Sequence, residues 1–495
     1  MLGNDEIVKL IQNDNASTEK TFARTADLYY DGLHDIRKHR VFYINDAGDA
    51  VEVTNRSNIR ISHPFFTELV DQKVQYMLSG CDAIVKSDIP ELQTLLDEYF
   101  GDDFQAELMD VLTSASVHGC AYLYAFVNED GRTEFRFADG MGVVEVSEKE
   151  SSDGKAYTIY HVFDRMIDNK KIELVQVWDD TQTHYYKMVG NALTVDDSQP
   201  INPRPHIVYE KDGVKYGDVY GFIPFFRFDN NKRQRSDLAP IKALIDDYDL
   251  MACSLSNDLQ DFRQALYVVR GFEGDSVDEI IQNVNGKRAI GIPDTAGGVD
   301  VQTVDIPIEA RRAKLEIDEK NIYRFGMGLN TAGLKDTTAT TNIAIKTAYA
   351  LLDLKCRKVE HNLRRYMKRI VKIALDEINK EKGTGYRVKD VYFDFERVTS
   401  VNEQENAQTD LTRAQAEQTR INALLSVASM LDNETIIKGI CDVLEIDYES
   451  IKDIIPADPL NSNAASDALL GAHPEELTDD QDTAQNSGAA GGVMQ

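Results

Sequence analysis

Apolar residues recur every three or four positions in several long stretches of the chain, and this spacing predicts helices. In residues 64–80 one helical stripe carries six of them, and Gly80 ends the stretch as a C-terminal cap. The six are Phe66, Leu69, Val70, Val74, Met77 and Leu78. Such a continuous stripe predicts a well-buried helix. Residues 1–40 also show helical spacing, but their apolar face is weak, so they are predicted to form an arm or a helix that needs a partner.

Short alternating stretches replace the helical pattern after residue 118. They include "AYLYAFV", "TEFRFA", "AYTIYHVFD", "KIELVQVWD" and "THYYKMVG", with turn residues between them, and they predict an antiparallel meander. The first two carry aromatic residues at alternate positions, namely Tyr122, Tyr124, Phe126, Phe135 and Phe137. We interpret this alternation as core packing in preference to stacking on nucleic-acid bases. Residues 41–235 are therefore predicted to combine helices with antiparallel strands.

Helical spacing returns over residues 236–264. Ser236 or Asp237 is suited to cap this helix, and Pro240 falls in the first turns, where its missing N–H costs little. A compact insert is predicted at residues 265–306, with three strands and one short helix.

A second helix is predicted at residues 307–327. Its apolar residues are sparse, and Ile308, Leu315 and Ile322 follow one another at sevenfold spacing, which predicts a narrow contact seam on an otherwise polar helix. The two helices and the insert together predict a helical hairpin with a small module at its tip.

A helix of about 40 residues is predicted at residues 342–382, and it is basic. It carries eleven Lys and Arg against five Asp and Glu, so it is expected to lie against an acidic neighbour or a phosphate backbone. Residues 383–456 follow with a short strand and further helices. Residues 457–495 contain seven acidic residues and no Lys or Arg, and they are predicted to be a disordered acidic tail.

Composition narrows the classes of function. The 495 residues include 54 Lys and Arg and 84 Asp and Glu, and the resulting net charge of −30 disfavours a protein that grips DNA by neutralising its phosphates. The five cysteines are scattered without metal-ligand spacing and predict reduced thiols. No run approaches 18 apolar residues and no secretory leader pattern begins the chain, so a chain made in a cytoplasm, without membrane contact, is expected.

The stretch "GLNTAGLKDTTATT" at residues 328–341 is close to a phosphate-binding loop but departs from it. Such a loop needs G-x4-G-K-[ST] directly after a buried strand. Here Leu334 separates Gly333 from Lys335, Asp336 stands where a hydroxyl residue belongs, and a predicted helix precedes the loop. A flexible connection between two helices is the preferred interpretation.

Other candidate chemistry is equally weak. Neighbouring carboxylates on the predicted helices are expected by chance in a chain with 84 acidic residues. His118 stands near Cys120, but this spacing fits packing at a helix-to-strand junction better than a nucleophile pair. No catalytic residue, cofactor or metal site is predicted, and the chain is not expected to be an enzyme.

Three phrases in a consistent order carry a family resemblance. They are "HPFFTELVDQKVQYMLSG", "PFFRFDNNKRQRSDLAPIKALIDDYDLMACSLSNDLQDF" and "NIAIKTAYALLDLKCRKVE", the last preceded by the Gly-rich loop. The ordered set, over about residues 58–379, resembles the portal proteins, or head-to-tail connectors, of tailed bacteriophages. The nearest type is found in long-tailed phages of Gram-positive bacteria.

The resemblance implies an α+β, mainly helical portal fold. After an N-terminal helical arm (1–40), it assigns a wing (41–235), a first stem helix (236–264), a clip (265–306), a second stem helix (307–327), a tunnel loop (328–341), a long helix shared by wing and crown (342–382), a crown (383–456) and the acidic tail (457–495).

The family forms a ring, usually of twelve subunits, at one capsid vertex, and DNA passes through its channel during packaging and ejection. The implied partners are further copies of the chain, double-stranded DNA without sequence specificity, the terminase large subunit, head-completion or adaptor proteins, scaffold and the major capsid protein. The implied location is the portal vertex of the virion, after assembly in the host cytoplasm. An ATP-dependent packaging motor or nuclease subunit, and a minor head or scaffold protein, are the alternatives.

The resemblance also selects candidate site residues. The DNA-facing tunnel loop would include Gly328, Asn330, Thr331, Gly333, Lys335, Asp336, Thr337 and Thr338, with Lys335 either reaching towards DNA or simply solvated. Clip contacts with motor or adaptor would include Arg263, Arg270, Lys287 and Arg288, for which isolated surface cations are the alternative. Contacts between neighbouring stems would use Ile308, Leu315 and Ile322, together with carboxylate pairing of Arg311, Arg312 and Lys314.

Overall fold

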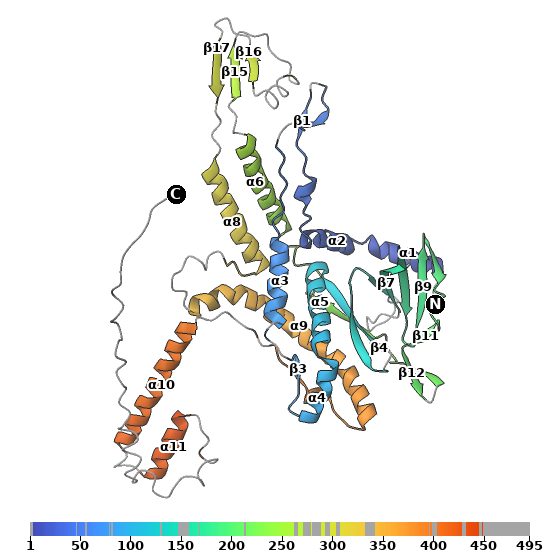
Figure 1. Ribbon diagram of the computed structural model, residues 1–495, viewed down its shortest axis with the longest axis vertical. Helices are drawn as coiled ribbons and strands as arrows, with labels where there is room; N and C mark the ends of the chain where they lie inside the picture. The colour runs from blue at the N-terminus through green and yellow to red at the C-terminus, as the bar shows by residue number, and fades with distance from the viewer. Residues whose placement is uncertain are drawn as a thin grey trace, which may run out of the picture. The chain divides into compact units, whose positions relative to one another are not determined.

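The protein consists of two compact units, Met1–Ser400 and Val401–Gln495. The computed structural model (Figure 1) describes residues 3–45, 47–54, 57–78, 80, 83–128, 131–146, 158–167, 169–211, 214–261, 266–270, 279, 289–292, 298–302, 307–331, 342–395, 397, 403–427, 432–444 and 448.

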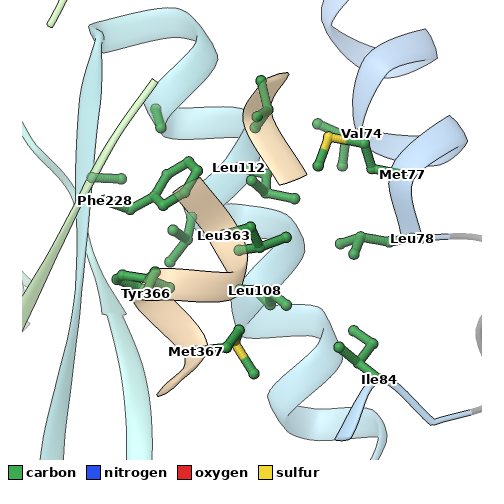
Figure 2. Packing of buried hydrophobic residues seen from close by; sticks show 14 of the residues in the cluster. Val74, Met77, Leu78, Ile84, Leu108, Leu112, Phe228, Leu363, Tyr366 and Met367 are labelled. Atoms are coloured by element: carbon green, nitrogen blue, oxygen red, sulfur yellow. The ribbon is translucent and has the colours of Figure 1, made fainter. Parts of the chain in front are cut away.

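The main hydrophobic core of the first unit lies between helices. Its helices are α1 (Asn4–Asn15), α2 (Thr18–Tyr30), η1 (Asp35–Lys38), α3 (Phe65–Leu78), α4 (Pro90–Tyr99), α5 (Asp102–His118), α6 (Lys242–Asp261), α8 (Ile308–Gly326), α9 (Asn342–Lys382) and η4 (Val388–Asp390). Residues of α3, α5 and α9 gather in the main hydrophobic cluster, where Figure 2 shows Leu108 and Leu112 of α5 with Leu363 and Met367 of α9. All six residues of the predicted α3 stripe are buried, so that prediction is confirmed.

The predicted meander is confirmed. Strands β6 (Val143–Val146), β7 (Thr158–Ile167), β8 (Lys170–Trp178), β9 (Gln182–Val189) and β10 (Ala192–Val195) form one antiparallel sheet in the order β10-β9-β8-β7-β6, and β11 (Arg204–Pro205) pairs with β9. Helix α1 buries Ile7, Val8 and Ile11 against this sheet, in a cluster with Tyr160 and Val175. The partner that the N-terminal helical arm needs is therefore a sheet of its own chain.

The first unit also contains shorter sheets. Strands β14 (Phe225–Asp229), β4 (Cys120–Val127) and β5 (Thr133–Ala138) form an antiparallel sheet. Three two-stranded pairs are β1 (Phe42–Ile44) with β2 (Ala50–Glu52), β12 (Ile207–Lys211) with β13 (Val214–Asp218), and β18 (Tyr392–Phe393) with β3 (Val85–Lys86). The pairing of β18 means that part of the segment predicted as crown packs within the first unit.

The helical hairpin is present, with a small sheet inserted between its two helices in chain order. Helices α6 and α8 lie side by side, and between them come β15 (Leu266–Arg270), β16 (Ala289–Ile292) and β17 (Gly298–Gln302) (Figure 1). Strand β15 is central, parallel to β16 and antiparallel to β17. The short helix predicted within the insert lies outside the described residues.

Helix α6 begins at Lys242, six residues later than the predicted cap Ser236. The intervening backbone forms tighter turns, in which the N–H groups of Ala239 and Ile241 donate to carbonyls three residues earlier. Asp237 does not cap the helix, because its carboxylate is used by two lysines described below. The predicted bounds of α8 and α9 agree closely with the structure.

The second unit contains α10 (Glu403–Ser426) and α11 (Asn433–Val443), which contact each other. Asp432 caps α11, because its side chain accepts a hydrogen bond from the Thr435 N–H at 3.0 Å. The acidic tail predicted at residues 457–495 lies outside the described residues.

Candidate functional site

The facing charges of the hairpin helices are paired within the chain. Arg311 of α8 lies 2.6 Å from a carboxylate oxygen of Asp258 on α6, and Lys314 of α8 lies 2.5 Å from Asp247, also on α6. Lys314 also contacts Asp318 one turn along its own helix. Two of the three cations expected to pair between neighbouring stems therefore have carboxylate partners on the other helix of their own hairpin.

The third cation, Arg312, is 71% exposed and pairs with Glu316 at 3.1 Å along α8. The sevenfold seam does not lie on one surface. Ile308 is exposed, but Ile322 is fully buried, because the C-terminal end of α8 packs against α3 and joins the core. Among the described residues of α6 and α8, the large apolar side chains that are exposed are Leu250, Leu259, Ile308, Ile317 and Phe325.

An extended segment, residues 57–63, runs along α6 and is held by side chains of that helix. The hydrogen bonds run from four backbone N–H groups of the segment, those of His63, Ile61, Ile59 and Ser57, to the side chains of Asp249, Cys253, Asn257 and Asp261, in that order, at 3.0, 3.2, 2.6 and 3.3 Å. Successive acceptors are four residues apart on α6, and successive donors are two residues apart on the segment.

The two repeats match in length. Four helical residues rise about 6 Å, and two extended residues span about 6.6 Å, so successive helix side chains meet successive backbone donors. We call this arrangement the side-chain ladder. The sequence analysis did not predict the side-chain ladder, although the hydrogen-bonding residues at every fourth position of α6 could have indicated it.

The ladder ends at a buried ion pair. Asp249 is fully buried, its Oδ2 lies 2.6 Å from His34 Nδ1, and its Oδ1 lies 2.7 Å from His63 Nδ1. His34 stacks on Tyr29, and its Nε2 lies 3.2 Å from the Tyr29 carbonyl oxygen. Both ring nitrogens of His34 therefore lie against oxygen atoms. Burial alone would raise the pKa of Asp249, but the hydrogen bonds from His34 and His63 hold it below its usual value.

A second buried charge cluster lies where the hairpin and the long helix meet the core. The Lys73 ammonium is buried and donates to Asp237 at 2.9 Å, and Lys355 of α9 lies 3.0 Å from the same carboxylate. Asn230 and Ser116 accept the other hydrogen bonds of Lys73. We call these residues the Lys73 cluster.

Two lysines therefore share one carboxylate in the Lys73 cluster. Burial lowers the pKa of Lys73. Burial by itself would raise the pKa of Asp237, but the charges of Lys355 and Lys73 hold it well below its usual range. Lys355 also donates to the carbonyl of Gly326 at 2.9 Å, so the cluster ties α9 to the last turn of α8.

The first residues after α8 are packed against the core. A Cβ on Gly328 would lie 2.0 Å from the end of the Leu69 side chain, so any larger residue there would force Leu69 to move. Leu329 is buried, and its N–H donates to Gln72 at 2.9 Å. Asn330 bonds Glu319 at 3.1 Å, and Thr331 is exposed. A DNA-facing loop therefore starts no earlier than Asn330, and Gly328 belongs to the packed base of the loop.

The remaining candidate residues of the loop and clip fall largely outside the description. Gly333, Lys335, Asp336, Thr337 and Thr338 of the loop lie outside the described residues, as do Arg263, Lys287 and Arg288 of the insert. Arg270 is the last residue of the central strand β15. Their roles stay predictions.

The Cys/His fragment is part of a structural ion cluster. His118 Nδ1 lies 2.8 Å from Asp139, and Nε2 contacts Asp27. Burial by itself lowers the pKa of His118, but hydrogen bonds to Asp139 and Asp27 raise it to about 9. Burial raises the pKa of the Cys120 thiol. The His118 ring is engaged by two carboxylates and the Cys120 thiol is held protonated, so the two groups do not form an activated nucleophile pair.

Among the residues that the structure describes, no group of three or more His, Cys, Asp or Glu is arranged to hold a metal ion. Likewise, no described helix combines the length and apolar character needed to cross a membrane.

Comparison with known proteins gives a consistent result. A family model described as "Phage portal protein, SPP1 Gp6-like" matches residues 11–454. The portal protein of Bacillus phage SPP1 is 28% identical over 337 residues, which cover 68% of this chain and 66% of that protein, just under two thirds of its length. The portal protein of Clostridium phage phiCD119 is 26% identical over 391 residues, covering 75% of this chain and 82% of that protein.

The mixed α+β fold and these matches define a portal protein of a tailed phage. Within that class, the chain belongs to the SPP1 Gp6-like family, whose model spans every described element from α2 onwards. The resemblance stated from the sequence phrases is confirmed.

Proposed function

We propose that copies of this chain form a ring at one vertex of a phage capsid, and that double-stranded DNA passes through the central channel during packaging and ejection. The observation that carries this proposal is the family match over residues 11–454. A ring of twelve subunits in the virion is the expectation from the family resemblance.

The insert β15–β17 is proposed to be the clip, which docks the terminase large subunit during packaging and head-completion proteins afterwards. Support comes from its place in the chain, because it interrupts a helical hairpin at the turn between α6 and α8. Arg263, Arg270, Lys287 and Arg288 remain the candidate contacts. Scaffold and the major capsid protein are the proposed partners of the rest of the ring during assembly in the host cytoplasm.

The role proposed for the chain is structural, with ATP hydrolysis left to a separate motor. The net charge of −30 supports a conduit, because an acidic channel wall repels phosphate and lets DNA slide. The loop beyond Asn330 is proposed to face the DNA, with Lys335 as its one cation.

Negative-stain images of the purified full chain test the ring. Axial views with a closed ring and a central hole are expected, and monomers or irregular aggregates at every protein concentration would contradict the proposal. ATP turnover by the purified chain that is lost on Lys335→Ala would favour the motor alternative instead.

The loop has its own test. Lys335→Glu is expected to leave ring assembly intact and to lower DNA packaging or retention, whereas the matched control Lys335→Arg keeps the charge and should behave as the parent protein. Loss of ring assembly in Lys335→Glu would mean that the loop has a structural role.

A further inference from the structure

Helix α9 exposes a row of residues at alternating spacings of three and four. The row begins with Leu351 and Leu354, which are 42% and 60% exposed, and continues with cations. The exposed cations are Lys358, Arg365, Lys368 and Lys372, with His361 between the first two. We call this row the basic seam. From Lys358 to Lys372 it extends about 21 Å.

Several other cations of α9 have carboxylate partners, unlike the cations of the basic seam. Arg364 pairs with Glu360, Lys380 with Asp218, and Lys355 with Asp237. Within the described part of the chain, no carboxylate lies within 4.0 Å of the four seam cations. A row of uncompensated positive charge in a chain of net charge −30 indicates an acidic partner.

A complementary surface exists on α4 and α5. Residues 88–110 contain eight acidic residues and no Lys or Arg. Glu98 pairs with Arg132, and Glu107 accepts the Phe137 N–H. The exposed carboxylates without a cation within 4.0 Å in the described part of the chain include Asp88, Glu91, Asp97, Asp102 and Asp103. We call these five residues the acidic face.

The basic seam and the α5 part of the acidic face lie on the outer sides of two helices that share one core. Leu363 of α9 and Leu108 of α5 belong to the same hydrophobic cluster, and Figure 2 shows both side chains. Lys372 lies roughly 180° around α9 from Leu363, and Asp103 lies roughly 140° around α5 from Leu108. Because both helices bury their inner sides in the shared core, Lys372 and Asp103 are turned away from it and belong to separate surfaces.

This arrangement suits a head-to-tail ring. A cyclic ring needs two different, complementary surfaces on each subunit, one for each neighbour. The apolar start of the basic seam favours a protein partner over DNA, because Leu351 and Leu354 gain from burial while phosphate offers them nothing. Spacings of three and four residues are also those at which a helix packs against another helix.

We propose that the basic seam of one subunit docks on the acidic face of a second copy of this chain, its neighbour in the ring. The inference rests on the proposed ring function and assigns two surfaces to its subunit interface. Opposite charges then fix the direction of packing around the ring, because seam against seam and face against face are repulsive.

The test uses two charge-reversed forms of the full chain. The seam variant is Arg365→Glu with Lys372→Glu, and the face variant is Asp97→Lys with Asp103→Lys. Mass photometry gives the subunit concentration at which half of the protein is in rings. We expect each variant alone to require at least a tenfold higher concentration than the parent chain, and an equimolar mixture to recover rings with alternating subunits, because every interface then joins opposite charges.

A matched control for the seam variant makes the same change of net charge away from both surfaces. Lys232→Glu with Arg233→Glu, on an exposed loop before α6, should assemble as the parent chain does. Recovery in the mixture also shows that both variants fold, because misfolded subunits cannot complement one another.

Three results would overturn the proposal. If the seam variant forms rings as the parent chain does, the basic seam is not an interface, whereas failure of the parent chain itself to form rings would contradict the proposed function. If the seam variant fails alone and in the mixture, and deletion of residues 457–495 has the same effect, the seam binds the acidic tail. If the seam variant assembles normally but loses binding of a short DNA duplex, the partner is DNA.

Discussion

The side-chain oxygen of Asn257 accepts a hydrogen bond from the backbone N–H of Ile59 at 2.6 Å, across 198 positions of sequence. A side chain of α6 thus takes the place of a neighbouring strand for an extended segment. The same relation recurs three more times along the side-chain ladder, so residues 57–63 are held to α6 without belonging to a sheet.

Replacing Asn257 with Leu should release the segment locally. The Ile59 N–H would lose its acceptor, and the protein should lose about 1–2 kcal/mol of unfolding free energy. Hydrogen exchange of the peptide covering residues 57–63 is the direct measurement, and it should speed up. Asn257→Asp keeps an acceptor at the same place and is the control; equal protection in the parent, Asn257→Leu and Asn257→Asp proteins would rule out the ladder as the cause of order in this segment.

Asp249→Ala should be among the most damaging single changes in the hairpin. It leaves the buried His34 without its carboxylate, and removal of one partner of a buried pair costs about 3–5 kcal/mol. Denaturant unfolding gives the value. Glu316→Gln breaks the exposed pair with Arg312 and should change stability by no more than about 0.5 kcal/mol. Similar small effects of both changes would show that the Asp249 pair does not stabilise the fold.

The Asp249 carboxylate predicts a loss of stability at acid pH. The folded-state pKa of Asp249 is held below its usual value, so its contribution to stability is present above the unfolded-state pKa of about 4 and is lost as pH falls through the folded-state pKa. The difference in stability between the parent protein and Asp249→Asn should therefore shrink as pH falls below about 4.

The Lys73 cluster predicts which of two substitutions destabilises the fold more. Asp237→Asn leaves Lys73 and Lys355 buried together without a counter-charge, whereas Lys73→Met leaves a one-to-one pair between Asp237 and Lys355. Asp237→Asn should therefore be the more destabilising by about 2 kcal/mol or more. Thermal unfolding of the two variants checks the order, and a more stable Asp237→Asn protein would contradict the shared-carboxylate arrangement.

His118 predicts a loss of stability at alkaline pH. Its folded-state pKa of about 9 lies above the unfolded value of about 6.5, so its contribution is fully present below pH 6.5 and is lost as pH rises through 9. The contribution is on the order of 3 kcal/mol. Unfolding free energies measured between pH 6 and pH 10 should fall more steeply for the parent protein than for His118→Gln, and parallel profiles would show that the imidazole is not charged in the fold.

Much of the fold follows from local patterns. The bounds of α8 and α9, the buried stripe of α3 and the antiparallel meander could all be predicted, because helical and strand periodicity record which side of an element is buried. The start of α6 could not, because the carboxylate that suits an N-cap is claimed by lysines from α3 and α9. The periodicity of the sequence does not show whether a polar side chain will bond to the adjacent backbone or to a residue far away in the chain.

The candidate site shows the same limit. Arg311 and Lys314 are expected to pair with carboxylates of a neighbouring stem, and in the structure they pair with Asp258 and Asp247 of the same chain. Gly328 fits the composition of a flexible loop, yet it packs against the Leu69 side chain, which a larger residue would displace. Residue type records the chemistry of a contact, and only the packed structure selects the partner.

By itself, the sequence determined the family, the order of the elements and the excess of negative charge, since all three are written in ordered phrases, periodicity and composition. Tertiary structure alone decided that residues 57–63 bind α6, that Lys73 and Lys355 share Asp237, and that Leu363 of α9 and Leu108 of α5 join one core. The physical reason is that these relations join residues tens to hundreds of positions apart, and burial and charge act between such residues only after the chain has folded.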